Sequence, residues 1–114
     1  MQERDESTGM NVAQLLMRTA SVFPERPAIM LGERKIVDYR ELARRAASIA
    51  TCLRSDLGLA PGDRVALFMT NNVAYLELLY GVWWAGGIVV PINAKLHPKE
   101  VAYIIGNAGA ACLF

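Results

Sequence analysis

The chain has 114 residues, enough for one modest domain, and its apolar fraction of 54% and charged fraction of 20% are ordinary for a globular protein. The formal net charge is +1, and the lysines and arginines are scattered without a run of five like charges. These values exclude a protein that binds nucleic acid through a strongly basic face.

The first ten residues (1–10) are expected to form a disordered lead-in to the rest of the chain. They are polar and contain no apolar segment of the kind that a secretory signal needs. Asn11 and Gln14 can form a capping box that starts a helix, and Pro24 ends it because the residue before a proline disfavours helical backbone angles. The apolar stripe of this helix is predicted to consist of Val12, Leu15, Leu16 and Val22.

A hairpin and a second helix follow. Residues 28–31 and 35–37 flank the turn residues 32–33, which predicts two short strands joined by a tight turn. Asp38 can then cap a helix, with Glu41 at the reciprocal position of a capping box. The inner face of this helix is predicted to be Leu42, Ala46, Ile49 and Leu53. Its outer face, expected to be solvated, is Arg40, Arg44, Arg45 and Ser48.

The middle of the chain alternates between strands and helices. Residues 64–69 contain an apolar run that fits a strand covered on both faces. Asn71 or Asn72 can cap a third helix, which is apolar on nearly all sides and is therefore expected to be buried all round. Residues 85–87 close this helix, and residues 88–90 form the next strand.

Pro98 opens a fourth helix, which Gly106 and Asn107 are expected to stop, and residues 111–114 begin a last strand. Strands that alternate with helices predict an α/β fold with a mostly parallel sheet and crossover helices. Three crossover units cannot cover both faces of such a sheet well, so we expect a portion of a larger domain. The uncharged stretch 78–92 is too short to span a membrane and is interrupted by glycine and proline.

Two cysteines and one histidine are the first candidates for chemistry. Cys52 and Cys112 are expected to be buried, reduced thiols, which favours a cytoplasmic compartment. His97 has no carboxylate or cysteine paired with it in the local sequence and is expected to be an exposed neighbour of a helix cap. The sequence has no phosphate loop, no serine elbow and no glycine fingerprint of a dinucleotide-binding oxidoreductase. We therefore expect neither a catalytic nor a metal-binding residue in this chain.

Several short motifs nonetheless occur in an order that resembles one known superfamily. They are FPERPA at residues 23–28, YREL at 39–42, PGDRVA at 61–66, AGG at 85–87 and VPIN at 90–93. Together they resemble the start of the adenylate-forming superfamily, which joins acyl-CoA synthetases, luciferases and the adenylation domains of peptide synthetases. Asp38 stands where the superfamily usually has Thr or Ser, and it caps a helix about as well. The resemblance implies that residues 11–114 are the first part of the large AMP-binding domain of an acyl-CoA synthetase-like fold.

The glycines and prolines of these motifs are expected to serve the scaffold. Pro61 and Gly62 predict a β-turn, in which the carboxylate of Asp63 binds backbone amides. Gly86 and Gly87 allow a buried helix to reverse into a buried strand without the clash that a Cβ atom would cause.

The resemblance implies an enzyme that activates a carboxylic acid with ATP and Mg²⁺ to an acyl-adenylate and transfers the acyl group to CoA. The superfamily's phosphate-binding loop and catalytic lysine lie further along the chain, so this segment alone is expected to be inactive. The acid is expected to be fatty or aromatic and the protein cytoplasmic. In some members of the superfamily the loop after the VPIN strand and the helix that follows lie near the nucleotide end of CoA, so the resemblance makes Lys95 and Lys99 candidate contacts for its phosphates. A lysine and a helix N-terminus together suit an anion, and the alternative is that both lysines are only solvated.

Two alternatives stay open. An adenylation domain of the same superfamily would load a carrier protein instead of CoA, and the residues that distinguish the two follow Phe114. A non-enzymatic α/β module would bind a partner chain and would have to fold alone. The partners expected for a ligase are the acid, CoA, the remainder of the same domain and, in a homodimer, a second copy.

Overall fold

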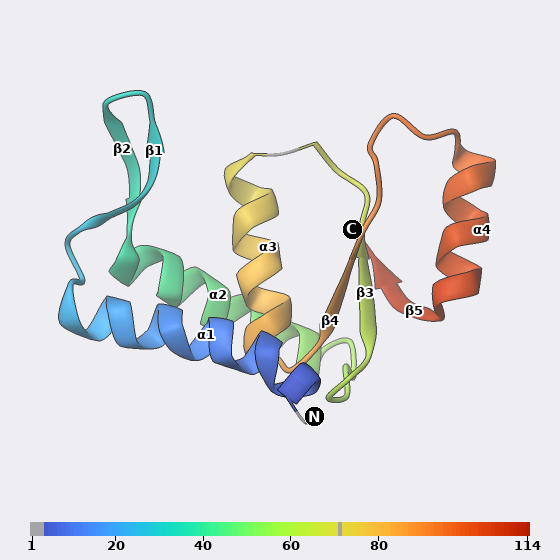
Figure 1. Cartoon of the computed structure of the whole chain (residues 1–114), viewed down its shortest axis with the longest axis horizontal. Coiled ribbons are helices and arrows are strands. Elements are labelled where there is room, and N and C mark those ends of the chain that lie inside the picture. Colours follow the sequence, from blue (N-terminus) through green and yellow to red (C-terminus); the bar gives the residue numbers. More distant parts are fainter. Residues whose placement is uncertain (1–3, 71) are drawn as a thin grey trace.

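The computed structural model describes residues 4–70 and 72–114, and Figure 1 shows how their elements are arranged. The elements follow the predicted order of helix, hairpin, helix and then alternating strands and helices. Their bounds are α1 Arg4–Val22, β1 Pro27–Leu31, β2 Arg34–Asp38, α2 Tyr39–Ser55, β3 Arg64–Leu67, α3 Val73–Trp84, β4 Ile88–Pro91, α4 Pro98–Ala108 and β5 Ala110–Leu113.

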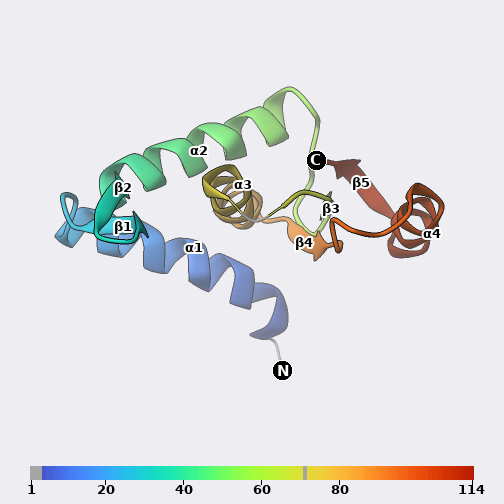
Figure 2. The same cartoon turned by 90° about the horizontal axis from the view of Figure 1, so that it is seen from above.

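The strands β3, β4 and β5 form a parallel sheet in the order β4-β3-β5, while β1 and β2 form a separate antiparallel hairpin. Figures 1 and 2 show α3 on one face of the parallel sheet and α4 on the other. The strand order explains this arrangement. The chain steps from β3 to one neighbour and then back past β3 to the other, so crossovers of one hand must use opposite faces. The predicted α/β fold with a mostly parallel sheet is confirmed.

The central strand β3 alternates its side chains between two apolar clusters. Val65 and Leu67 lie in the cluster that contains Val82 of α3, and Ala66 packs with Val101 of α4. The three β3 residues are each 0% exposed, which confirms the prediction of a strand covered on both faces.

The helices α1, α2 and α3 pack against one another and form a layer beside the sheet (Figure 2). Their shared core includes Leu42 and Ala46 of α2. Trp84, the last residue of α3, packs against this core and also against the cluster that α3 forms with the sheet. Of the predicted inner face of α2, Leu42, Ala46 and Leu53 are buried, whereas Ile49 is only partly buried.

The first helix begins earlier than predicted. α1 starts at Arg4, and Asn11 lies inside it, so the start predicted at Asn11 is wrong. The sequence contains no proline between these two residues, and a helix that has formed extends over such a segment one residue at a time. Residues 1–3 lie outside the described residues, and the division of the chain after residue 10 stays a prediction.

Two helices are less buried than predicted. In α1, Leu15 is 57% exposed and Val22 is 60% exposed, although both belong to the predicted apolar stripe. In α3, which was expected to be buried all round, only Gly81 and Val82 are buried, and Leu76 is 37% exposed. Periodicity shows which side of a helix is apolar, but burial also requires a neighbour that covers that side.

The end of α3 confirms the role predicted for its two glycines. Gly86 has a φ of 86°, its amide donates to the carbonyl of Trp83 at 3.0 Å, and the amide of Gly87 donates to the carbonyl of Val82 at 2.8 Å. This pair of hydrogen bonds around a left-handed residue is a Schellman motif. A Cβ atom on Gly87 would lie 2.9 Å from Cγ1 of Val82, so the helix can turn into β4 only because the side chain is missing.

The turn before β3 also forms as predicted. The amide of Asp63 donates to the carbonyl of Ala60 at 3.0 Å, with Pro61 and Gly62 between them. Gly62 has a φ of 86°, which is the left-handed backbone that the third position of a type II turn requires. The carboxylate of Asp63 accepts a hydrogen bond from the amide of Ala60 at 2.9 Å and so closes the turn from its other side.

The fourth helix starts at Pro98 as predicted but runs past its predicted end. It continues through Gly106 and Asn107 to Ala108, and Gly109 ends it with a φ of 67°. Gly109 therefore takes the left-handed position that usually terminates a helix, whereas Gly106 keeps helical angles at a modest cost. None of the helices in the described residues combines the length and apolar character that crossing a membrane requires.

Candidate functional site

The carboxyl ends of the parallel strands are where open α/β sheets usually bind ligands. The loop after β3 includes the described residues 68–70 and 72, and the loop after β4 runs from residue 92 to residue 97. Figure 1 shows both loops at the same edge of the sheet. Both candidate lysines lie on the second loop or directly after it, so this edge is the candidate site.

The loop after β4 is held in one shape by its own backbone and by Asn93. The amide of Ile92 donates to the carbonyl of Leu67 at 2.9 Å, which anchors the loop to β3. The side-chain oxygen of Asn93 accepts from the amide of Lys95 at 2.9 Å, and its carbonyl accepts from the amide of Leu96 at 3.1 Å. Such an Asx turn fixes the path of the chain. Lys95 is exposed on this turn.

His97 caps the helix that follows, through a capping box that was not predicted. Its Nδ1 accepts from the amide of Lys99 at 3.1 Å, and the carboxylate of Glu100 accepts from the amide of His97 at 3.1 Å. His97 was expected only as a neighbour of the cap. The missed signal was Glu100 three residues after it, the spacing of a capping box.

The structure places Lys95 and Lys99 on neighbouring parts of one junction and leaves both exposed. The N-terminus of α4 has few free amides that could bind an anion. The amide of Lys99 already donates to His97, and the amide of Glu100 donates to the carbonyl of His97 at 2.9 Å. The carboxylate of Glu100 also places a negative charge in the same turn. An anion would therefore be bound by the two ammonium groups rather than by a ring of amides.

A shallow hollow of about 370 Å³ adjoins this junction on the surface of α4. Its lining residues are Leu96, Lys99, Glu100, Tyr103 and Ile104. Tyr103 is 73% exposed and lines the same hollow as Lys99.

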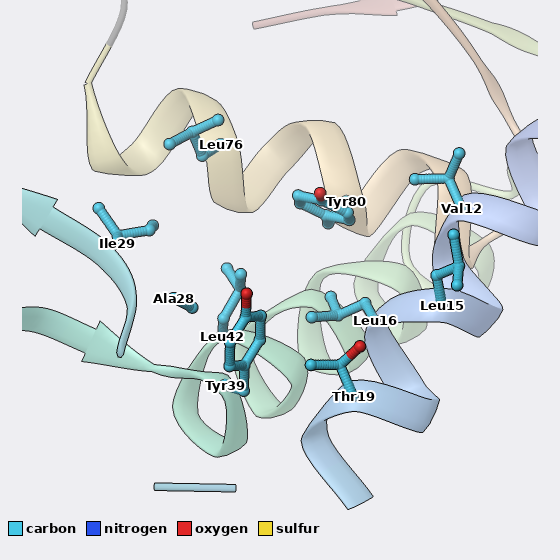
Figure 3. Close-up of a pocket in the computed structure, with 10 residues that line it drawn as sticks. All are labelled: Val12, Leu15, Leu16, Thr19, Ala28, Ile29, Tyr39, Leu42, Leu76 and Tyr80. Carbon is cyan, nitrogen blue, oxygen red and sulfur yellow. The ribbon is translucent and has the colours of Figure 1, made fainter. Parts of the chain in front are cut away.

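A second hollow, of about 280 Å³, lies within the helix layer (Figure 3). It is apolar apart from the hydroxyl groups of Thr19, Tyr39 and Tyr80, and none of its lining residues is charged. Its lining comes from α1, β1, α2 and α3 and from none of the parallel strands. Figure 3 shows the side chains of these elements converging on the space from three sides. It is therefore separate from the candidate site.

An ion network joins α2 to α3. The carboxylate of Glu41 binds Arg44 at 2.6 Å and Arg45 at 2.8 Å, and Arg45 also binds Glu77 of α3. The hydrogen bonds from Arg44 and Arg45 lower the pKa of Glu41 from 4.5 to about 2. Asp38 caps α2 as predicted, accepting from the amide of Glu41 at 2.8 Å, but the side chain of Glu41 serves the arginines and does not complete a capping box.

The outer face of α2 is thus only partly the solvated surface that was predicted. Arg45 reaches a carboxylate on the neighbouring helix, and the side chain of Glu77 is only 16% exposed. The sequence held a signal for this pair, because Glu77 is the one charged residue on an otherwise apolar helix and a charge in such surroundings needs a partner.

Neither cysteine has the environment of a nucleophile. Both are free thiols, but Cys52 is exposed, so its predicted burial is wrong, and Cys112 is partly buried. A hydrogen bond to Asp56 raises the pKa of Cys52, and burial raises the pKa of Cys112. A raised pKa lowers the fraction of thiolate, which is the reactive form. Among the described residues, no group of three or more His, Cys, Asp or Glu side chains is placed to hold a metal ion.

Comparison with known proteins extends this description. The family described as "AMP-binding enzyme" matches residues 16–114. A long-chain-fatty-acid–CoA ligase of Salmonella typhimurium is 35% identical over 104 residues, which cover 90% of this chain and 18% of the ligase. A feruloyl-CoA synthase of an Amycolatopsis species is 38% identical over 97 residues, which cover 85% of this chain and 19% of that protein.

The fold of this chain is also similar to that of solved structures. A Mycobacterium tuberculosis fatty acyl CoA synthetase superposes with a TM-score of 0.80 at 34% identity, covering 93% of this chain and 21% of that one. The chain spans about a fifth of the length of the curated relatives that it matches: 18% of the ligase and 19% of the feruloyl-CoA synthase.

Proposed function

Because the chain belongs to the AMP-binding enzyme family, we propose that the full-length protein is an AMP-forming acid–CoA ligase. It activates a carboxylic acid with ATP, releases pyrophosphate and transfers the acyl group from the acyl-adenylate to the thiol of CoA. The match of the family over residues 16–114 carries this proposal. The relatives are named for long-chain fatty acids and for feruloyl-CoA, which supports a fatty or an aromatic acid as the substrate.

This segment contributes structure rather than reacting groups. It builds three strands of a parallel sheet and sets the two loops at their carboxyl ends, where the rest of the domain would complete a ligand site. ATP and Mg²⁺ are the cofactors of the proposed reaction. The described residues hold no cluster of metal-binding side chains, so they do not fit Mg²⁺, and the metal would be bound elsewhere in the protein. We place the protein in the cytoplasm.

We also propose Lys95 and Lys99 as contacts for the phosphates of CoA. Both ammonium groups are exposed at one loop-helix junction, at the sheet edge where ligands are expected. Changing both lysines to glutamine should raise the KM for CoA by about tenfold, since each exposed ion pair contributes roughly 0.5–1 kcal/mol. The KM for ATP should stay unchanged, and Arg54→Gln on the exposed end of α2 is the matched control. An unchanged KM for CoA in the double variant would remove both residues from the site.

The remainder of the same domain is the proposed partner of the exposed apolar side chains at the sheet. Ile88 on β4 is 46% exposed and Leu113 on β5 is 46% exposed, and these strands form the two edges of the sheet. A neighbouring strand or helix would bury both. A homodimer is a further expectation, which the molecular mass of the full-length protein in solution would test.

The function is tested by measuring pyrophosphate release by the full-length protein with ATP and a series of short, long and aromatic acids. We expect release that depends on one class of acid, and acyl-CoA formation when CoA is added. Acyl transfer to a holo-carrier protein but not to CoA would instead identify an adenylation domain. The isolated 114-residue chain should release no pyrophosphate with any acid. Absence of acid-dependent pyrophosphate release by the full-length protein would refute the ligase.

A further inference from the structure

The outer half of the β1–β2 hairpin projects from the helix layer without a core of its own (Figure 1). At the base of the hairpin, Ile29 and Val37 pack into the core of the helix layer. Beyond them, residues 30–35 are all exposed, and we call this segment the hairpin tip. Two of its side chains are large and apolar: Met30 is 47% exposed and Leu31 is 66% exposed.

The register of the hairpin pairs each apolar side chain of the tip with a basic one. Met30 lies opposite Lys35, and Leu31 lies opposite Arg34. Residues directly opposite one another point to the same face of a ladder, and successive residues point to opposite faces. Each face of the hairpin tip therefore carries one apolar and one basic side chain. Glu33 is the acidic residue of the tip, so two basic groups and one acidic group leave a net charge of +1.

We propose that the hairpin tip is a membrane-contact site for the surface of an anionic lipid bilayer. Met30 and Leu31 enter the boundary between headgroups and acyl chains, while Arg34 and Lys35 bind the lipid phosphates. Long basic side chains suit this arrangement, because their apolar stems lie along the inserted residues and their charged ends stay at the level of the headgroups.

Both parts of the tip are needed for this contact. A single exposed apolar side chain is ordinary on a protein surface, but here two adjacent ones lie on a projecting turn, and each face of the hairpin tip combines an apolar with a basic side chain. Neither the apolar pair nor the basic pair alone binds a bilayer strongly, and together they give a reversible attachment that salt weakens. The inference does not depend on which acid the protein activates.

The test is co-sedimentation of the full-length protein with vesicles of mixed phosphatidylcholine and phosphatidylglycerol, and with vesicles of phosphatidylcholine alone. We expect binding to the mixed vesicles and much weaker binding to the neutral ones. The variant Met30→Ser/Leu31→Ser and the variant Arg34→Gln/Lys35→Gln should each bind the mixed vesicles about tenfold or more weakly. Leu57→Ser, at a site that is 54% exposed after α2, is the matched control and should bind like the parent.

A second measurement separates insertion from adsorption. Leu31→Trp places an indole at the hairpin tip, and its emission should shift to shorter wavelength with mixed vesicles if the tip enters the bilayer. The inference is overturned if the parent does not bind mixed vesicles, if Met30→Ser/Leu31→Ser binds them as well as the parent does, or if the added indole shows no shift. Unchanged far-ultraviolet circular dichroism of the serine variant shows that lost binding does not reflect unfolding.

Discussion

The packing of α2 against α3 depends on the absence of a side chain at Gly81. We therefore expect Gly81→Ala to destabilise the protein. A Cβ atom at this position would lie 2.4 Å from Cγ2 of Ile49 and 2.7 Å from its Cβ. Carbon atoms in contact prefer roughly 3.5–4.0 Å, so the two helices would have to separate by about 1 Å. Overpacking of this kind costs about 1–3 kcal/mol.

A second helical glycine provides the control that isolates this steric cost. Alanine is favoured over glycine inside a helix by about 1 kcal/mol, and this gain applies at both positions. A Cβ atom on Gly106 of α4 would meet no atom within 4 Å. Gly106→Ala should therefore raise the stability by up to about 1 kcal/mol. For Gly81→Ala the steric cost of about 1–3 kcal/mol is set against this gain of about 1 kcal/mol, and we expect a net loss of up to about 2 kcal/mol.

The assay is thermal unfolding of the full-length protein and both variants, followed by circular dichroism. Gly81→Ala should melt below the parent and Gly106→Ala at or above it. In an Ile49→Ala background, which lacks the atom that lies closest, Gly81→Ala should cost less stability than it does in the parent, although the contact with Cβ of residue 49 remains. If Gly81→Ala and Gly106→Ala have the same melting temperature, then α2 and α3 do not approach as closely at Gly81 as the structure indicates.

Two further predictions concern the start of α2. The pKa of Glu41 is lowered by Arg44 and then by Arg45 from 4.5 to about 2, so its ion pairs should stabilise the fold fully above pH 4.5 and less as the pH falls toward 2. The difference in melting temperature between the parent and Glu41→Gln should therefore shrink over this range, and a difference that is constant with pH would contradict the pairing. Asp38→Ala should destabilise the protein by about 1 kcal/mol because it removes the cap on the amide of Glu41, whereas Asp38→Ser should retain most of the stability in the same denaturation experiment.

Features of the fold that depend on neighbouring residues could be predicted from the sequence. The cap at Asp38, the turn at Gly62 and the reversal at Gly86 each follow from the chemistry of a few consecutive residues. The alternation of strands and helices then leaves few topologies, and the observed parallel sheet is one of them.

Features that depend on distant residues were predicted less well. Leu15 belongs to an apolar stripe, yet it is exposed because no described element covers that part of α1. The pairing of Arg45 with Glu77 joins two helices, and no local pattern specifies which side chains meet there. The start of α1 was missed because Asn11 is a good cap that the longer helix does not use.

The candidate site was predicted only in part. The sequence placed Lys99 in the first turn of a helix, and the structure agrees. It did not show that His97 and Glu100 already occupy the free amides of that turn, which changes how an anion would be held. The capping box therefore leaves a phosphate to be bound by side chains of this junction, the two lysines among them, rather than by the amides that His97 and Glu100 occupy.

Trp84 belongs to the core of the helix layer and to the cluster between α3 and the sheet at once. One indole ring thus contacts both cores, in addition to the helices α2 and α3, which contribute side chains to each of them. Protection from hydrogen exchange in the two regions should accordingly be lost in a single cooperative step, and shortening this side chain should weaken that coupling.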